Sequence, residues 1–349
     1  MTRNAVELLS RLIATPSVSR NEENTAAILA EYLSEAGCEV ERIYNNVIAR
    51  SADWREELPV LMLNSHHDTV PPAASYTRDP YAPELIDGRL YGLGSNDAGA
   101  SLVSIVETFG NVHRMQLPFN ILLVLSAEEE CSGEKGFRGI YPQLGRIDAG
   151  IVGEPTGLQA AVGERGLVVL DCVSHGVSGH AARREGVNAL YAAVDDIEKL
   201  RNLSFPRVSG LLGDISVNVT MIQAGTRHNV IPDECRWVVD IRTTDVMTNE
   251  EVVEYIRTAI PETEVIPRST RIRASTIADN HPLVIAAKSL GASVFVSPTT
   301  SDMALMPFPT LKIGPGESSR SHSADEFVKI SEISDGIKFY TDLIKNIRF

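Results

Sequence analysis

Three continuous apolar segments in the first half of the chain each run directly into acidic or imidazole side chains. They are PVLMLNS before His66, FNILLVLS before the acidic residues up to Glu130, and AGIV before Glu154. Short apolar runs between helical segments are typical of strands buried on both faces of an α/β sheet. Because α/β proteins place their active sites on loops beyond the strand ends, we expect these polar residues to lie together and to be functional.

Two further residues extend this set of candidates. Asp97 follows the turn YGLGSN and begins a helical segment, and His322 lies in the loop GPGESSRSHSADE before the last helix. Alone, Asp97 is equally typical of a helix cap, and the triplet Glu128–Glu130 of a solvated acidic turn. Together, two histidines and three carboxylates suit a pair of divalent metal ions around a shared water. The combination therefore indicates a metal-dependent hydrolase.

The local geometry of the first strand end adds an orienting residue. His66 and Asp68 are two positions apart, so their side chains point to the same face of the strand. Asp68 can accept the N–H of one ring nitrogen of His66 while the other nitrogen faces a metal. Strand alternation does not separate the roles of Glu129 and Glu130, because the chain turns at these residues.

The pattern of strands and helices changes near residue 164 and returns near residue 275. Residues 1–164 and 276–349 alternate helices with apolar strands, which predicts an α/β catalytic domain with a central mixed sheet flanked by helices. Residues 165–275 contain strands of alternating polarity, such as CRWVVDIRTT, and two helical stretches. They predict an α+β domain inserted into the first.

Composition excludes several classes of partner. The chain has 46 acidic and 32 basic residues, a formal charge of −14, which disfavours nucleic acid and anionic membrane surfaces. We find no signal-peptide pattern and no apolar run long enough to span a bilayer. The cysteines are far apart and form no CxxC pair, so we expect no disulfide framework and a cytoplasmic location.

Seven segments, in this order, resemble the di-zinc family of acetylornithine deacetylase, succinyl-diaminopimelate desuccinylase, aminoacylase and carboxypeptidase G. They are HHDTVP, GRLYGLGSNDAG, SAEEECSG, VGEPT, GHAARREGVNAL, GTRHNVIPDE and GPGESSRSHSADE, and they span nearly the whole chain. The overall length and the segment GHAARREGVNA are most similar to deacetylases of arginine and lysine biosynthesis. One departure is Glu128, where many relatives have aspartate.

The resemblance implies two Zn²⁺ ions, with Co²⁺ or Mn²⁺ as substitutes. Asp97 would bridge both ions, His66 and Glu154 would complete one site, and Glu130 and His322 would complete the other. The family pattern also implies a cis peptide bond after Asp97. These assignments come from the matching motifs and not from the spacing of the residues.

The same resemblance assigns three residues to catalysis. Glu129 would be the general base, taking a proton from water and passing it to the leaving amine. Asp68 would orient His66. His180, in the segment SGHAA, would donate a hydrogen bond to the carbonyl oxygen of the tetrahedral intermediate, often from the second subunit of a dimer. The inserted domain would thus be a ferredoxin-like lid and dimerisation domain in a homodimer.

Four positions match residues that hold substrate in the family: Asn229, Arg242, Gly314 and Gly316. Arg242 can pair with a substrate carboxylate but is equally compatible with an ordinary exposed strand position. The glycines would offer backbone N–H groups near that carboxylate, although GPG is also a common turn. Arg183 and Arg184 suit either an acidic acyl group or solvent.

We therefore expect a two-metal amide hydrolase that removes the acyl group from a small N-acyl amino acid. N-acetylornithine, in arginine biosynthesis, is the expected substrate. The alternatives are an N-succinyl-amino-acid desuccinylase acting on ornithine or diaminopimelate, a deacetylase of N-acetyl-lysine or N-acetylcitrulline, and a dipeptidase. A catalytically silent binding protein of the same fold is the non-enzymatic alternative.

Overall fold

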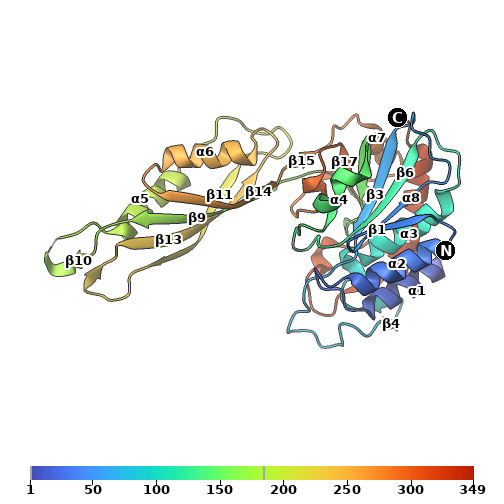
Figure 1. Cartoon of the computed structure of the whole chain (residues 1–349), viewed down its shortest axis with the longest axis horizontal. Helices are drawn as coiled ribbons and strands as arrows, with labels where there is room; N and C mark the ends of the chain where they lie inside the picture. The colour runs from blue at the N-terminus through green and yellow to red at the C-terminus, as the bar shows by residue number, and fades with distance from the viewer. Residues whose placement is uncertain (1, 184) are drawn as a thin grey trace. The chain divides into compact units, whose positions relative to one another are not determined.

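The computed structural model describes residues 2–183 and 185–349, which form two compact units. Unit 1 comprises Met1–Val162, Thr276–Phe295 and Ser301–Phe349, and unit 2 comprises Gly163–Ser275 and Val296–Thr300. The chain colours in Figure 1 show that unit 2 is formed mainly by the middle of the sequence, from green to orange, and unit 1 by the sequence before and after it.

Unit 1 is built on a mixed sheet of nine strands in the described part of the chain. Its order is β1-β2-β6-β3-β7-β17-β8-β15, with β16 paired to β8. Strands β6, β3, β7 and β17 run parallel to one another, and β1 and β2 continue the sheet in antiparallel pairing. The strands are β1 (Val40–Ile43), β2 (Asn46–Arg50), β3 (Val60–His66), β6 (Asn120–Ser126), β7 (Ala149–Val152), β8 (Ala160–Glu164), β15 (Ser275–Thr276), β16 (Val294–Ser297) and β17 (Thr310–Lys312).

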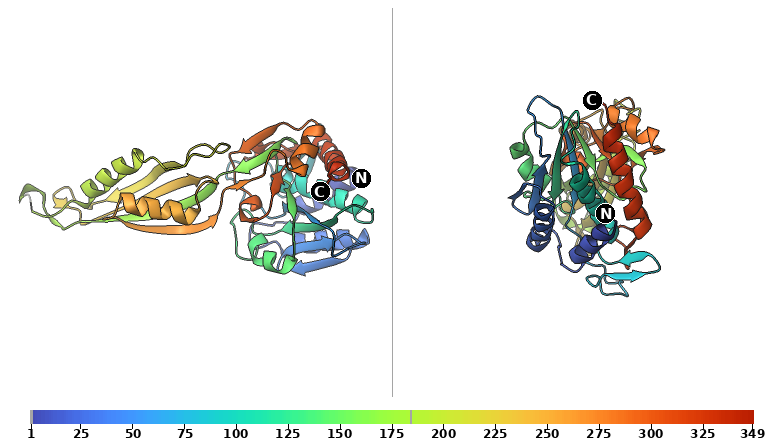
Figure 2. Two further views of the ribbon diagram at one scale, coloured as in Figure 1. Left: turned by 90° about the horizontal axis from the view of Figure 1, so that it is seen from above. Right: turned by 90° about the vertical axis from the view of Figure 1, so that its right-hand side faces the viewer.

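Helices cover both faces of this sheet. Every residue of β3 is buried: Leu61 and Leu63 pack with α1, α2, α3, α7 and α8, whereas Val60 and Met62 pack with α4. The long helix α8 is seen along its length in the right-hand view of Figure 2. The α/β architecture predicted from the sequence is confirmed. The helices are α1 (Thr2–Ile13), α2 (Glu23–Glu35), α3 (Ala100–Val112), α4 (Phe137–Leu144), α7 (Pro282–Ser289) and α8 (Ile330–Asn346).

Short elements complete unit 1 around the ends of the parallel strands. A small sheet pairs β18 (Phe327–Lys329), β5 (Arg89–Tyr91) and β4 (Glu84–Ile86). Three short helical turns are η1 (Ser95–Gly99), η3 (Asp302–Leu305) and η4 (Ser318–Arg320). The sequence patterns did not predict the small sheet, because its strands are too short to show a period.

Unit 2 is an antiparallel sheet in the order β11-β13-β9-β14 with two helices packed on it. Alternate residues of β13 are buried, and Trp237 is the largest side chain of this core. The chain order β9-α5-β11-β13-α6-β14 is the βαββαβ arrangement of ferredoxin-like domains. The bounds are β9 (Gly166–His175), α5 (Ala189–Arg201), β11 (Ser216–Ala224), β13 (Glu234–Thr243), α6 (Asn249–Ala259) and β14 (Glu264–Ile272).

Two short strands extend unit 2 beyond the end of its main sheet. β10 (Gly179–His180) pairs with β12 (Val230–Ile231), and the turn η2 (Ala181–Arg183) follows β10. Across both described units, we find no helix that combines the length and the apolar character needed to cross a membrane.

Candidate metal centre

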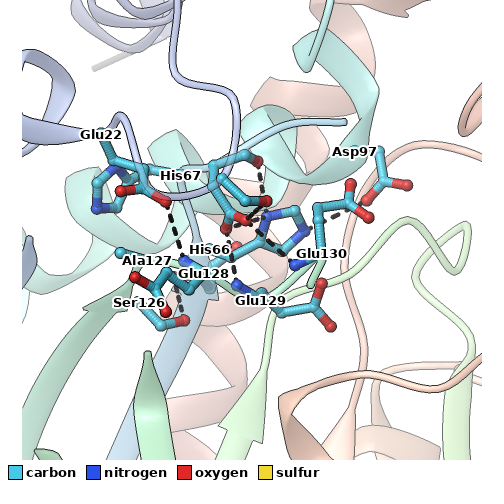
Figure 3. A network of polar contacts seen from close by, with 12 residues as sticks. Glu22, His66, His67, Asp97, Ser126, Ala127, Glu128, Glu129 and Glu130 are labelled. Atoms are coloured by element: carbon cyan, nitrogen blue, oxygen red, sulfur yellow. Dashed lines mark hydrogen bonds and ion pairs between the residues drawn. The ribbon is translucent and has the colours of Figure 1, made fainter. Parts of the chain in front are cut away.

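The parallel strands of unit 1 bring three candidate ligands to one edge of the sheet. β6, β3 and β7 are neighbours, so their carboxyl ends lie side by side. His66 is the last residue of β3, Glu130 lies in the turn after β6, and Glu154 follows β7. Figure 3 shows the turn after β6 beside the end of β3, with Asp97 close to His66.

The carboxylate of Asp97 lies between the two candidate histidines. Its Oδ1 is 3.4 Å from Nε2 of His66, and its Oδ2 is 3.6 Å from Nε2 of His322. Nε2 of His66 is also 3.8 Å from Oε1 of Glu154, and Nε2 of His322 is 3.0 Å from Oε2 of Glu130. The five expected ligands thus form two groups that share Asp97.

The donor set fits two divalent ions. Donors bound to one tetrahedral Zn²⁺ at 2.0–2.1 Å are about 3.3 Å apart, which is close to the separations found in these two groups. Donor atoms of His66, Asp97 and Glu130 all lie within 4.8 Å of one another. Nδ1 of His66 lies 3.0 Å from the backbone oxygen of Asp68, which can only accept. Nδ1 therefore carries a proton, and Nε2 is the ring nitrogen that faces the candidate site and would bind an ion there.

Asp68 holds more of the site than the sequence predicts. Its carboxylate accepts the backbone N–H groups of Glu129 at 3.0 Å and Glu130 at 3.1 Å, and the hydroxyl of Ser19 at 2.7 Å. The same carboxylate is 3.5 Å from Nδ1 of His66. Asp68 therefore orients the turn that carries the expected base, and it contacts His66 mainly through its backbone oxygen.

Several acidic side chains of the site are buried close to one another. Burial raises the pKa of Glu154 to about 8, and burial also raises the pKa of Glu129 well above its usual range. Burial alone would lower the pKa of His66, but hydrogen bonds to Asp68 and Asp97 raise it well above the usual value. Several buried carboxylates cannot all be ionised unless a cation offsets their mutual repulsion. The cluster therefore favours cation binding, in agreement with the donor geometry.

The backbone at Asp97 has the conformation expected of the family. The peptide bond between Asp97 and Ala98 is cis. The surrounding residues form the irregular turn η1, in which Asp97 has φ −111° and ψ 101°, outside the helical range. This turn begins α3 and directs the Asp97 carboxylate toward both histidines.

Two buried carboxylates near the site escaped the sequence interpretation. Asp302 accepts a hydrogen bond from the hydroxyl of Ser126 at 2.6 Å, and burial raises its pKa to about 6. Glu326 is 2% exposed and accepts backbone N–H groups from the Asp97 turn. Neither residue follows an apolar strand, which was the signal that identified the other carboxylates. In the sequence, Asp302 after Ser301 has the pattern of an ordinary helix start.

His180 and Asn229 lie together at one end of unit 2. His180 is exposed and pairs with Val230 in the β10–β12 ladder, and the backbone oxygen of Asn229 accepts the N–H of Ala181. Nδ1 of His180 accepts the N–H of Ala182 at 3.1 Å. A neutral His180 therefore carries its proton on Nε2, which leaves that nitrogen available as a donor.

Arg242 lies in the main sheet of unit 2, at the end opposite to His180 and Asn229. It pairs with Leu167 at the start of β9, whereas the ladder ends at His175 and Glu234, and β10 and β12 form a separate pair beyond that end. At about 3.3 Å per residue, Arg242 is roughly 26 Å from Glu234 and farther from His180. Its guanidinium binds Asp240 in the same strand, at 2.8 and 3.2 Å. The structure thus separates the expected substrate residues of unit 2 into two groups.

The remaining expected substrate contacts are only partly available. The N–H of Gly314 donates to Oγ1 of Thr156 at 3.0 Å, so in this structure it is engaged within the protein. Gly316 has φ +90°, a conformation that favours glycine. Arg183 is exposed at the end of η2, and Arg184 lies outside the described residues.

The fold and the donor set together define an α/β metallohydrolase. Residues 62–346 match the sequence model of peptidase family M20/M25/M40, and the chain belongs to this family. The resemblance seen in the sequence motifs is therefore confirmed. The protein is a metallohydrolase that acts on amide bonds, as its sequence predicts.

Two curated relatives show the range of substrates among similar proteins. An acetylornithine deacetylase from Edwardsiella ictaluri is 30% identical, over 97% of this chain and 96% of its own. A succinyl-diaminopimelate desuccinylase from Paracoccus denitrificans is 29% identical, over 72% of this chain and 70% of its own.

Solved structures share the fold over the whole chain. The aminopeptidase PepT from Bacillus cereus has a TM-score of 0.80 at 18% identity, covering 99% of this chain and 98% of its own. The Bacillus subtilis protein YXEP, described as a dinuclear metal-binding peptidase of the M20 family, has a TM-score of 0.75 at 19% identity, covering 99% of each chain.

Proposed function

We propose that the protein removes the acetyl group from N-acetylornithine, in arginine biosynthesis in the cytoplasm. The observation that carries the hydrolytic part is the carboxylate of Asp97 shared between two histidine–carboxylate groups, at 3.4 and 3.6 Å from the histidine nitrogens. The choice of acyl group and amino acid is supported by the acetylornithine deacetylase from Edwardsiella ictaluri, which is similar over 97% of this chain.

The residues around this centre have distinct tasks in the proposed reaction. His66, Asp97 and Glu154 would hold one divalent ion, and His322 and Glu130 would hold a second together with Asp97. Two Zn²⁺ ions supply Lewis acidity, which polarises the acyl carbonyl and lowers the pKa of a water molecule. Co²⁺ and Mn²⁺ suit the same donors.

Glu129 is the proton carrier in this proposal. It accepts a proton from the attacking water as the water oxygen forms a bond to the carbonyl carbon, and the carbonyl oxygen takes the negative charge. The N–H at Nε2 of His180 stabilises that oxygen by hydrogen bonding. Glu129 then gives the proton to the amine nitrogen as the C–N bond breaks, which leaves a carboxylic acid and a free amine. The acid proton then passes to the amine, so the products are a carboxylate and an ammonium group.

A homodimer through unit 2 completes the proposal. Arg242 is about 26 Å from the far end of the main sheet, and His180 lies beyond that end in the separate β10–β12 sheet. This separation is far longer than an N-acyl amino acid, so the two residues cannot contact one substrate molecule from the same unit. If both act on substrate, His180 belongs to the site of a second subunit. Exposed apolar side chains support this interface: Tyr191 and Val194 on α5, and Met221 and Ile222 on the edge strand β11.

An N-succinyl amino acid is the second candidate substrate. A succinyl-diaminopimelate desuccinylase from Xanthomonas campestris is 28% identical over 99% of this chain, close to the identity of the deacetylases. The exposed guanidinium of Arg183, near His180, can pair with the additional carboxylate of a succinyl group.

A hydrolysis screen tests the proposed substrate. The metal-loaded protein is assayed with N-acetyl derivatives of ornithine, citrulline and lysine, the N-succinyl derivatives of ornithine and diaminopimelate, and a dipeptide. We expect the highest kcat/KM for N-acetylornithine and no turnover after chelation. A higher value for a succinyl substrate would transfer the proposal to the desuccinylases. Protein that binds no metal and hydrolyses none of these amides would be a silent binding protein.

A further inference from the structure

Glu326 is a buried carboxylate that contacts the Asp97 turn without belonging to the candidate ligands. Its Oε2 accepts the backbone N–H of Gly94 at 2.8 Å. Its Oε1 accepts the backbone N–H groups of Asn96 and Asp97, both at 2.8 Å. One side chain therefore binds three of the backbone donors in the turn that presents the shared carboxylate.

The turn needs an acceptor of this kind. Asn96 is buried, and the irregular dihedral angles at Asp97 and Ala98 interrupt the helical hydrogen-bond pattern at this point. Buried backbone donors without acceptors are strongly unfavourable, so these groups require a partner from elsewhere in the chain. A carboxylate has two acceptor oxygens and no donor, whereas the amide of glutamine would face one of the three N–H groups with its own NH₂.

A second contact ties the same turn to the segment before His322. Oδ1 of Asn96 accepts the N–H of Glu317 at 2.9 Å, and Nδ2 of Asn96 donates to the backbone oxygen of Glu317 at 3.1 Å. The close approach depends on Gly316, where an added Cβ would lie 2.6 Å from Oδ1 of Asn96. The loop that carries His322 is thus attached to the Asp97 turn at both of its ends, at Glu317 and at Glu326.

The backbone of Glu326 is itself fixed. Its carbonyl oxygen accepts the N–H of Gly92 at 3.0 Å, and the next residue, Phe327, pairs with Tyr91 between β18 and β5. His322, by contrast, has a positive φ of 56° and a side chain that is 54% exposed. Because little packing restrains His322, its position relative to Asp97 depends on the anchors at the two ends of its loop.

We infer that Glu326 is a positioning residue that sets the spacing between Asp97 and His322, and so the affinity for the metal ion these two residues share. The inference deepens the proposed function, since it requires the metal centre described above. Nε2 of His322 and Oδ2 of Asp97 are 3.6 Å apart, which is close to the donor separation around one ion. Loss of the anchor would let this distance vary while leaving all five ligands in place.

The neighbouring residue provides a matched control. Asp325 also accepts two backbone N–H groups, from Thr77 at 2.9 Å and from Arg78 at 3.0 Å, but these belong to a different loop. E326Q and D325N each replace a carboxylate by an amide of the same shape, one residue apart. Only E326Q disturbs the turn of Asp97.

The test measures metal binding directly. Metal-free wild type, E326Q and D325N are titrated with Co²⁺ and followed by visible absorption, and metal content is measured after dialysis. We expect two ions in the wild type and in D325N. In E326Q one of the two should bind about 10–100-fold more weakly, which is typical of lost outer-shell contacts to metal ligands. Thermal unfolding of the metal-free proteins reports general destabilisation separately.

Each result has a defined meaning. Wild-type affinity for both ions in E326Q overturns the inference, even if the metal-free variant is less stable. Equal losses in D325N and E326Q also overturn it, because the effect would then be general to the loop. If E326Q does not fold, E326D is judged by the same criterion, since it keeps the carboxylate but is one CH₂ group too short to reach all three N–H groups. A wild type that binds no metal contradicts the proposed function instead.

Discussion

At the scale of single residues, adjacent glutamates in one turn have different environments. Oε2 of Glu130 is 3.0 Å from Nε2 of His322, within one of the two ligand groups. Glu129 lies next to it, and burial together with the charges of Glu154 and Asp302 raises its pKa. The backbone N–H groups of both residues bind the carboxylate of Asp68. Burial also raises the pKa of Glu130, so its position beside His322, and not its pKa, distinguishes Glu130 as the expected ligand of the two.

Replacing the proposed base should separate catalysis from metal binding. We expect E129Q to lower kcat by about 10²–10⁴-fold, because glutamine cannot accept and return a proton. Its metal content, measured by mass spectrometry, should equal that of the wild type. E130Q is the matched control and should lose metal. Near-normal turnover in E129Q, with both metals bound, would contradict the assigned role.

At the scale of elements, each unit has its own core, and the fourth strand of unit 2 shows what a sequence pattern misses. β14 pairs with β9 at the edge of the sheet, and its ladder has register shifts beside Pro267. Proline is tolerated only on edge strands and at bulges, and the irregular register removes the alternation that identifies a strand. Alternating polarity therefore does not reveal β14, which is the fourth strand of the main sheet in the described part of unit 2.

The helix α6 offers a direct test of local stability in unit 2. The Thr248 hydroxyl accepts the N–H of Glu251, and the Glu251 carboxylate accepts the N–H of Thr248, which forms a complete capping box. We expect T248A to lower the free energy of unfolding by about 0.5–2 kcal/mol. Urea unfolding followed by the fluorescence of buried Trp237, in a W54F background, measures it. T258A, at the other end of α6, should have a smaller effect, and equal losses would contradict the role of the cap.

At the scale of the whole molecule, the separation of His180 from Arg242 makes assembly part of the proposed mechanism. In a dimer in which His180 acts on the partner's site, E129Q and H180A subunits complement each other. The mixed dimer then has one site with both an intact Glu129 and an intact His180. A variant that lacks either residue cannot form such a site with itself.

Mixing the two inactive variants tests this arrangement. After subunit exchange at equal concentrations, we expect about a quarter of wild-type activity, because half of the dimers are mixed and each has one complete site. Sedimentation and mass-tagged subunits verify that mixed dimers form. Mixed dimers without recovered activity would place His180 in its own subunit's site, and a fully active monomer would rule out the dimer.

Much of the fold and the candidate ligand set could be predicted before the structure. β3 and β6 are buried along their whole length, so each appears in the sequence as a continuous run of mainly apolar residues. His66 is the last residue of β3, Glu130 lies in the turn after β6, and Glu154 follows the buried strand β7. The βαββαβ unit was recognisable in part, from the alternation of β9, β11 and β13.

The sequence by itself determined which residues have the chemistry for two divalent ions and where the buried strands lie, because side-chain type and burial period are local properties. Only the tertiary structure decided which residues meet. The strand order β6-β3-β7-β17 sets the ligands side by side, and the carboxylate of Asp97 is shared between His66 and His322. The buried anchors Glu326 and Asp302 have no local signature, since their partners are backbone and hydroxyl groups far away in the chain.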